Sequence, residues 1–228
     1  MQMTLATYNI HGCIGADGSF KPDRIVDVLQ EMNADVIALQ EVEHHQVEGY
    51  DLLDYFAAKT GLTAIAGPTL VRRTHHYGNA LLTRLPVVAV NRIDLTLPGR
   101  EPRGALDVTL AWNERRVHVV ATHLGLRPWE RRQQVRHLLK LFEIRLTEIY
   151  VLMGDLNEWF LWGRPLHWLH AHFKRPPHCA TFPARRPLMA LDRLWVHPRR
   201  RLKSLEAHSS GLARIASDHL PLKAIIEI

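Results

Sequence analysis

The sequence predicts a mixed α/β fold, in the form of a four-layer sandwich with two β-sheets face to face and helices outside. Short apolar runs typical of buried strands are separated by segments with the apolar spacing of helices. This succession occurs in the first half of the chain and again in the second. The pattern alone indicates only a mixed α/β protein, and its repetition suggests two packed sheets. A chain of 228 residues fits one domain covering residues 1–228.

Two segments have the spacing of a helix with one buried face. Both begin with proline, Pro22 and Pro128, a residue favoured in the first helical turn. The apolar positions of the first are Ile25, Val28, Leu29 and Met32. Those of the second are Val135, Leu138, Leu139 and Phe142. We expect cations to crowd its other face, namely Arg131, Arg132, Arg136 and Lys140. A third helix is expected over residues 49–60, with Gly61 ending it.

Several short segments are expected to form strands, because they are apolar or alternate and are bounded by turn residues. They cover residues 3–10, 35–40, 62–66, 79–83, 87–95, 105–112, 116–122, 149–153, 194–196 and 222–228. The nearly continuous apolar run at 35–40 is typical of a strand buried on both faces. The dipeptide Asn113-Glu114 indicates a hairpin turn between two of the strands.

The segment between Asn157 and Leu191 has no clear period and is rich in arginine, histidine and proline. Long irregular stretches inside a compact domain are usually functional, so we expect a short helix and then a long surface loop near the functional site. An apolar cluster, Trp159-Phe160-Leu161-Trp162, opens this segment. We favour packing of the cluster in the core beneath the loop, and contact of Trp159 and Trp162 with a membrane interface is the alternative.

The composition limits the classes of protein. Lysine and arginine outnumber aspartate and glutamate by 29 to 23, which gives a net charge of +6. This excess favours polyanionic partners such as nucleic acid or anionic phospholipid. No apolar run is long enough to cross a membrane, and residues 1–9 lack the pattern of a signal peptide. We therefore expect a cytoplasmic protein, with peripheral membrane contact as the alternative. Cys13 and Cys179 are expected to be reduced thiols.

Polar side chains stand where several strand-like segments stop. The fragments are Tyr8-Asn9, Gln40-Glu41, Gly78-Asn79, Thr122-His123, Gly154-Asp155-Leu156-Asn157, Leu191-Asp192 and Ser217-Asp218-His219. Carboxylates, amides and imidazoles at the ends of several strands suggest one shared site at the mouth of a β-scaffold. Oxygen ligands suit a hard cation such as Mg²⁺. Imidazole, amide and arginine groups suit a phosphate-like substrate.

Each fragment taken alone also has an ordinary explanation. Glu41 could simply reach solvent, although a buried carboxylate is costly unless something such as a metal compensates for its desolvation. Asp155 and Asn157 point the same way because they alternate along the chain, but they could also form a capped turn. His219 could be a surface residue, or Asp192 could orient and charge it.

Further candidates are weaker. His123 could donate a proton to a leaving oxygen or stabilise the transition state. Arg103 could pair with a phosphate oxygen or hold a carboxylate in place. Asp218 is a candidate metal ligand. The pairs His44-His45 and His75-His76 lack helical ligand spacing, and we expect them on the surface.

In its fragments and their order, the chain resembles the endonuclease/exonuclease/phosphatase superfamily. The matching fragments are TYNIHG, ALQEV, YGNALLTRLPV, THL, GDLN, LDRLWV and SDHLPL, which span nearly the whole chain. The fragment THL looks more like the deoxyribonuclease and sphingomyelinase branch than the abasic-site repair endonucleases. The disulfides and calcium sites of the secreted enzymes have no recognisable counterpart in the sequence.

The resemblance implies a four-layer α/β sandwich of two packed, mostly antiparallel sheets, and a phosphoesterase that depends on Mg²⁺, with Mn²⁺ as an alternative. The implied metal ligands are Glu41, Asn9 and Asp218. The implied catalytic residues are Asp155, Asn157, His219, Asp192 and His123. The side chains expected to bind the substrate are Arg103, Asn79 and Tyr77. In this scheme Asp155 activates a water molecule that attacks phosphorus in line, and His219 contacts the scissile phosphate.

The substrate stays open at this level, and so does the oligomeric state. A nucleic acid would agree with the cationic helix that begins at Pro128. A phospholipid headgroup would agree with the cluster around Trp159 and Trp162. A phosphomonoesterase for a soluble small molecule is the runner-up. A non-catalytic binding protein on the same fold is the remaining alternative, which the intact motifs disfavour.

Overall fold

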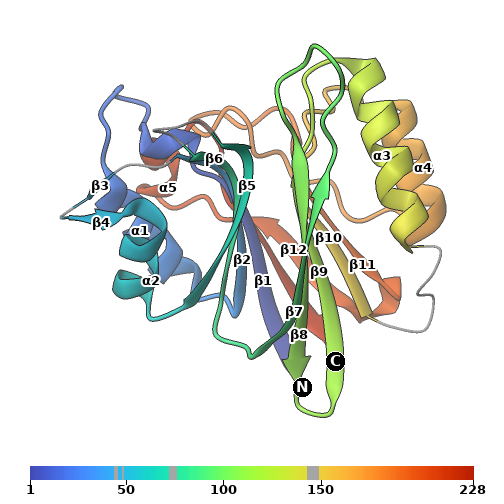
Figure 1. Ribbon diagram of the computed structural model, residues 1–228, viewed down its shortest axis with the longest axis horizontal. Coiled ribbons are helices and arrows are strands. Elements are labelled where there is room, and N and C mark those ends of the chain that lie inside the picture. The colour runs from blue at the N-terminus through green and yellow to red at the C-terminus, as the bar shows by residue number, and fades with distance from the viewer. Residues whose placement is uncertain (44–45, 48, 72–75, 143–148) are drawn as a thin grey trace.

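Two β-sheets face each other across a hydrophobic core, and helices cover their outer faces (Figure 1). The computed structural model describes residues 1–43, 46–47, 49–71, 76–142 and 149–228. The arrangement confirms the predicted four-layer α/β sandwich, and both sheets are mostly antiparallel as expected.

The larger sheet of the described chain has six strands. They are β1 (Gln2–Asn9), β2 (Val36–Glu43), β5 (Thr63–Val71), β6 (His76–Thr83), β12 (Leu202–Ala207) and β13 (Leu222–Glu227). Their order across the sheet is β12-β13-β1-β2-β6-β5. The pair β1–β2 is parallel, and the other neighbouring pairs are antiparallel.

The second sheet has five described strands. They are β7 (Val87–Asp94), β8 (Gly104–Trp112), β9 (Arg115–His123), β10 (Ile149–Asp155) and β11 (Asp192–His197). Their order is β11-β10-β9-β8-β7, and only β9–β10 is parallel among these pairs. A short hairpin, β3 (Gln46–Val47) and β4 (Tyr50–Asp51), stands apart from both sheets. Each large sheet therefore contains one parallel pair near its middle.

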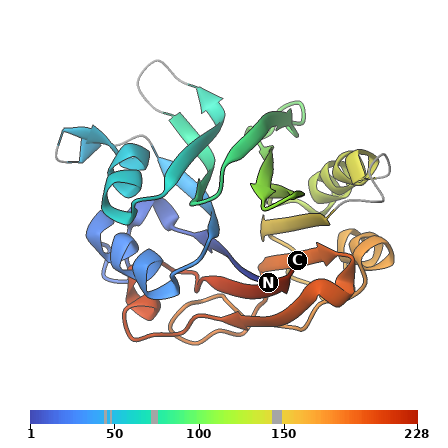
Figure 2. The same ribbon diagram turned by 90° about the horizontal axis from the view of Figure 1, so that it is seen from below.

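The helices form the two outer layers (Figure 2). Helices α1 (Pro22–Met32) and α2 (Leu52–Thr60) pack on the larger sheet, and α3 (Pro128–Phe142) and α4 (Arg164–Phe173) pack on the smaller one. The chain also forms the short helix α5 (Ala213–Ala216) and two 3₁₀ turns, η1 (His11–Cys13) and η2 (Arg199–Arg201). None of the described helices is long and apolar enough to cross a membrane.

Both proline-initiated helices begin where the sequence predicts, at Pro22 and Pro128. The predicted apolar positions of α1 are all buried. In α3, Val135, Leu138 and Phe142 are buried, and Leu139 is partly buried. Because burial of these apolar faces is what stabilises short helices in proteins, the apolar spacing located both helices correctly.

Other predictions need correction. The third helix begins at Leu52 rather than at residue 49, because the Asp51 side chain caps it by accepting a hydrogen bond from the backbone N–H of Leu53 at 3.0 Å. Arg131 was expected on a cationic face of α3, but it is buried against Glu158, with its Nε 3.1 Å from Oε2. Strand β12 was missed, because exposed and partly exposed residues dominate it and its pairing with β13 is not visible locally.

The Trp159–Trp162 cluster also differs from its prediction. The expected order of elements is confirmed, because helix α4 is followed by a long loop that reaches to β11. The cluster does not pack in the core, however, since Trp159 is 51% exposed and Trp162 is 80% exposed. Core packing, the favoured interpretation, is therefore wrong for these residues. The histidine pairs at 44–45 and 75–76 lie wholly or partly outside the described residues.

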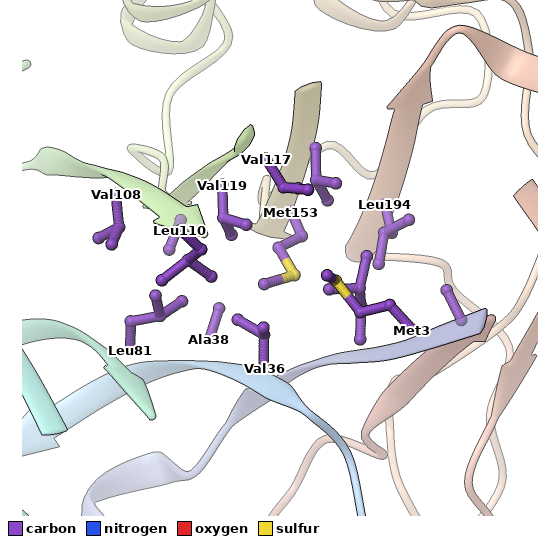
Figure 3. Packing of buried hydrophobic residues seen from close by; sticks show 14 of the residues in the cluster. Met3, Val36, Ala38, Leu81, Val108, Leu110, Val117, Val119, Met153 and Leu194 are labelled. Atoms are coloured by element: carbon purple, nitrogen blue, oxygen red, sulfur yellow. The ribbon is translucent and has the colours of Figure 1, made fainter. Parts of the chain in front are cut away.

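The two sheets are held together by apolar side chains that alternate along the strands (Figure 3). The larger sheet contributes residues such as Met3, Val36, Ala38 and Leu81, and the smaller sheet contributes residues such as Val108, Val119, Met153 and Leu194. All of these side chains are excluded from solvent. At roughly 25 cal/mol per Å² of buried apolar surface, this layer is a main source of the stability of the fold. It also fixes the relative position of the strand ends.

Gly154 is the tightest point between β9 and β10. Its φ of 147° is rarely adopted by residues with a side chain, and a Cβ atom there would lie 1.8 Å from the carbonyl oxygen of Thr122. Thr122 is its partner in the parallel register of the two strands. A larger residue would thus push apart the backbones that carry His123 and Asp155.

The substitution Gly154→Ala should destabilise the protein by about 3 kcal/mol or more, because neither the backbone conformation nor the contact with Thr122 can be kept. The free energy of unfolding from chemical denaturation measures this change. Gly211→Ala is the matched control, because no atom lies within 4 Å of a Cβ built at Gly211. Equal stability of the two variants would contradict the argument.

Candidate active site

The predicted site residues come together at one edge of the sandwich, where β1, β2, β9 and β10 end and β11 begins. This follows from the topology, because the two strands of each parallel pair end at the same edge. Asp155 lies beside His123 in the β9–β10 register and beside Asp192 in the β10–β11 register. Both chain termini lie at the opposite edge of the molecule (Figure 1).

The side-chain amide of Asn9 connects the two sheets at this edge. Its Nδ2 donates hydrogen bonds to Glu41 Oε1 at 2.9 Å and to Asp155 Oδ2 at 3.0 Å. The orientation of Asn9 is fixed on its other side, because Oδ1 accepts from the backbone N–H of His11 at 3.0 Å. The hydroxyl of Ser217 donates to the main-chain oxygen of Asn9 at 2.8 Å. Asn9 therefore turns its NH₂ group toward the carboxylates. Its role as a metal ligand stays a prediction.

Glu41 is a partly buried carboxylate in a negative environment. Burial raises its pKa, the hydrogen bond from Asn9 opposes that change, and the charges of Asp155 and Asp218 raise the pKa further. Its backbone has a φ of 55°, at an irregularity in the β2–β6 pairing between Leu39 and Val42. Backbone strain of this kind is concentrated at functional sites. The bulge gives Glu41 its place at the strand end.

His219 is held by a carboxylate, as the sequence suggested. Its Nδ1 lies 2.7 Å from Asp192 Oδ2, and that oxygen also accepts a hydrogen bond from Thr181 Oγ1 at 2.6 Å. Burial lowers the pKa of His219, but the charge and hydrogen bond of Asp192, followed by the charge of Asp155, outweigh it and raise the pKa to about 10. The imidazole is thus a cation at neutral pH, with Nε2 3.8 Å from Asp155 Oδ2.

His123 has the opposite protonation state. Burial lowers its pKa to about 3, the charge of Asp155 raises it, and the charge of Arg103 lowers it further. Its Nδ1 lies 3.2 Å from Arg103 Nη1, and its Nε2 lies 3.6 Å from Asp155 Oδ2. A neutral imidazole can donate one hydrogen bond but carries no additional acidic proton. The assignment of His123 as proton donor to a leaving group stays a prediction.

Asp155 and Asn157 form a capped turn and also face the site. The backbone N–H of Asn157 donates to Asp155 Oδ1 at 2.8 Å. This hydrogen bond forms the capped turn that the sequence also allowed for these residues. Asn157 Nδ2 lies 3.0 Å from the main-chain oxygen of Leu124 and 2.9 Å from His123 Nε2. The turn leaves Asp155 Oδ2 directed at Asn9 and the two imidazoles.

The three residues expected to bind substrate differ in their surroundings and in the hydrogen bonds they already make. Arg103 is buried beside His123, its Nη2 lies 3.0 Å from Glu101 Oε2, and its Nε has no hydrogen-bond partner among the described residues. Tyr77 lies in the same region, where burial and then the charge of Glu41 raise the pKa of its phenol. Asn79 donates to the main-chain oxygen of Gly104 at 3.0 Å, so its NH₂ group ties β6 to β8.

The oxygen donors fit a hard divalent cation. Glu41 and Asp155 both accept a hydrogen bond from the Asn9 amide. Asp218 is half-exposed, with Oδ1 3.9 Å from His11 Nδ1. Burial raises the pKa of Glu41, and the charges of Asp155 and Asp218 raise it further. A bound cation would offset both effects.

A second group of donors overlaps this one. Asp155, Asp192 and His219 place one potential ligand atom each within 4.8 Å of one another. Nδ1 of His219 already binds Asp192, however, so we interpret this trio as an imidazolium between two carboxylates.

Three contacts in the site had no recognised role in the sequence. Thr181 bonds Asp192, the Phe182 ring lies 4.8 Å from the His219 ring, and the Ser217 hydroxyl bonds the Asn9 backbone. Ser217 was visible as part of the SDHLPL fragment. No local signal marks Thr181 and Phe182, which lie in the long loop before β11.

The fold has many counterparts among solved structures. An endonuclease/exonuclease/phosphatase from Beutenbergia cavernae is 20% identical, with a TM-score of 0.77, over 100% of this chain and 72% of that one. The human Nocturnin catalytic domain is 18% identical, with a TM-score of 0.77, over 99% of this chain and 93% of that one. A mannosyl-6-phosphatase from Bacteroides thetaiotaomicron is 14% identical, with a TM-score of 0.77, over 99% and 100%. At these identities the likeness supports the fold.

The sequence comparisons go further. The uncharacterised protein YbhP of Escherichia coli strain K12 is 32% identical over 249 aligned positions, which cover 97% of this chain and 95% of YbhP. A model of the Endonuclease/Exonuclease/phosphatase family matches residues 6–219, a range that includes every predicted site residue from Asn9 to His219. The chain therefore belongs to the endonuclease/exonuclease/phosphatase family, whose members hydrolyse phosphoester bonds.

Proposed function

We propose that the protein is a phosphodiesterase that depends on a divalent metal ion, Mg²⁺ or Mn²⁺, and hydrolyses a P–O bond by in-line attack of water. One observation carries the proposal. Side chains from both sheets converge on Asp155, with the Asn9 amide 3.0 Å from Oδ2 and the charged His219 ring 3.8 Å from the same oxygen. A carboxylate between a metal-binding group and a cationic imidazole suits the activation of water beside a phosphate.

Asp155 is the residue that receives the proton of the attacking water. The water oxygen then bonds to phosphorus, and the bond from phosphorus to the leaving oxygen breaks on the opposite side. The leaving oxygen keeps the electron pair and takes a proton from solvent. The His219 cation, held by Asp192, stabilises negative charge on the phosphate oxygens as that charge develops. When bound at Glu41 and Asp218, the metal ion supplies further neutralisation of phosphate charge.

The remaining residues orient the reacting groups. Asn157 and His123 stand 2.9 Å apart on one side of Asp155, where they can hold water or the leaving oxygen. Arg103 and Tyr77 supply donors for phosphate oxygens beside them.

We also propose a cytoplasmic location.

The class of phosphoester distinguishes the proposed function from its alternatives. Hydrolysis of bis-p-nitrophenyl phosphate, with little activity on p-nitrophenyl phosphate, would support a diesterase. The reverse preference would point to a phosphomonoesterase for soluble substrates. No hydrolysis of either compound with metal present would favour a non-catalytic binding protein. A panel of plasmid DNA, RNA, phospholipids and inositol phosphates then identifies the natural substrate class.

Metal binding should depend on Glu41. Addition of Mg²⁺ or Mn²⁺ at about 100 times the dissociation constant should stabilise the wild type by about 2.7 kcal/mol, which is a rise in Tm of several degrees. The Glu41→Gln variant should lose most of this rise, because it removes one ligand charge. Differential scanning fluorimetry with and without EDTA measures the effect.

The matched control is Glu114→Gln, in the exposed hairpin between β8 and β9, which should retain the full metal-dependent shift. An equal shift in the Glu41 and Glu114 variants would show that Glu41 is not a ligand.

Turnover should depend on the pair His219–Asp192 as well as on Asp155. We expect Asp192→Asn to lower kcat on the diester by about 100-fold or more, and Asp155→Asn by more than that, because general acid–base and electrostatic groups each contribute about 10²–10⁴-fold. Circular dichroism and unfolding curves confirm that each variant is folded. Turnover within about twofold of wild type in either folded variant would refute the assigned role.

A further inference from the structure

An exposed apolar surface lies beside the candidate active site. It consists of six side chains from two loops and the first turn of α3, which we call the aromatic rim: Leu126, Trp129, Trp159, Phe160, Leu161 and Trp162. Each is at least 40% exposed. Single exposed apolar residues are ordinary on protein surfaces, but a contiguous group marks an interaction site.

The chain topology explains why the rim adjoins the site. The first loop leaves β9 directly after His123, and the second leaves β10 directly after Asp155 and runs through Asn157. Because β9 and β10 are parallel neighbours, both loops emerge at the same edge as the site residues. The rim and the group around Asp155 therefore lie at the same edge of the sandwich.

A buried ion pair joins the two loops at their base. Arg131 is excluded from solvent, and its Nη1 donates to the main-chain oxygen of Leu126 at 2.6 Å. Its Nε donates to Glu158 Oε2 at 3.1 Å, and Glu158 Oε1 accepts from the backbone N–H of Phe160 at 3.3 Å. The rim is therefore held in place before any partner binds, which lowers the entropic cost of docking.

Arginines surround the rim. Arg127 and Arg164 are exposed. Arg127 precedes Pro128, the first residue of α3, and Arg164 is itself the first residue of α4. Arg100 lies over the Trp129 ring, 5.4 Å from its centroid, and its Nε forms an ion pair with Glu130 Oε1 at 3.4 Å, which offsets part of its charge. The whole chain carries a net charge of +6. Apolar side chains bordered by arginine match an anionic lipid surface, where aromatic rings sit at the headgroup level and cations bind lipid phosphates.

The residue types of the aromatic rim and the contacts of its rings favour lipid over single-stranded nucleic acid. Bases bind proteins by stacking on free aromatic faces. Leu126 and Leu161 offer no such face, and Arg100 lies over the Trp129 ring. The Phe160 and Trp162 rings lie against each other, with centroids 5.3 Å apart. Mixed aliphatic and aromatic groups of this kind are typical of insertion at a membrane interface.

We propose that the aromatic rim docks the protein on an anionic phospholipid membrane, with the candidate active site facing the headgroups. Docking uses residues outside the proposed catalytic group. It therefore does not depend on hydrolysis, and its failure would leave the proposed diesterase activity untouched.

Cosedimentation with vesicles tests the proposal. Wild type should bind vesicles of equal parts phosphatidylglycerol and phosphatidylcholine, and bind phosphatidylcholine alone much more weakly. The double variant Trp159→Ala/Trp162→Ala should bind the anionic vesicles about tenfold more weakly or worse, a loss of about 1.4 kcal/mol or more. Asp155→Asn should bind as wild type does, which separates docking from catalysis.

The matched control is Val87→Ala/Val88→Ala, which removes exposed apolar groups at the start of β7, at the edge opposite the site. It should bind like wild type. The single variant Trp162→Ser, at the most exposed ring of the rim, gives the same answer if the double variant does not fold. No binding of wild type to anionic vesicles, or equal binding by the rim and control variants, would overturn the proposal. Rim-dependent binding to a single-stranded oligonucleotide without vesicle binding would also overturn it.

Discussion

The geometry of the site depends on one amide group. The NH₂ of Asn9 lies within 3.0 Å of an oxygen of both Glu41 and Asp155, and these two residues belong to different sheets. This donor offsets part of the repulsion between the two carboxylates, and at Asp155 the His219 cation, 3.8 Å from Oδ2, offsets more of it. Asn9 is itself fixed by His11 and Ser217, so the contact between the sheets continues into the loops. The packing of the two sheets therefore also determines how the two carboxylates are arranged.

The surroundings of Asp155 are asymmetric in charge. His219 is bonded to Asp192 and is a cation, whereas His123 is buried beside Arg103 and is neutral. Both rings lie within 4 Å of the same carboxylate oxygen. Two titratable groups with oppositely shifted pKa values, one on each side of a third, are characteristic of acid–base sites. The two imidazoles differ in charge because the fold places His219 against Asp192 and His123 against Arg103.

Much of this arrangement was predictable from the sequence because its signals are local. Apolar spacing after Pro22 and Pro128 located two helices, and buried apolar runs located most strands. The grouping of distant polar residues followed from the order of family motifs, and the structure brings Asn9, Glu41, Asp155 and His219 together. The catalytic and metal-binding roles of these residues remain predictions.

What the sequence could not supply were features decided by distant partners. Strand β12 has few buried residues, and it exists because it pairs with β13. Arg131 has the residue type of a surface position but pairs with Glu158, 27 positions away. The Trp159–Trp162 cluster has the composition of a core segment, yet the smaller sheet is already covered by α3 and α4.

The Arg131–Glu158 pair has a consequence for the evolution of related chains. Loss of either residue would leave the other as a buried charge without its hydrogen-bonded partner, and such a loss typically costs about 3–5 kcal/mol. Replacement of both by apolar residues of similar volume costs far less. Relatives should therefore keep both residues or change both together, and chains with only one of them should be rare. Where both are lost, the loops before α3 and before α4 would be free to diverge in length and composition.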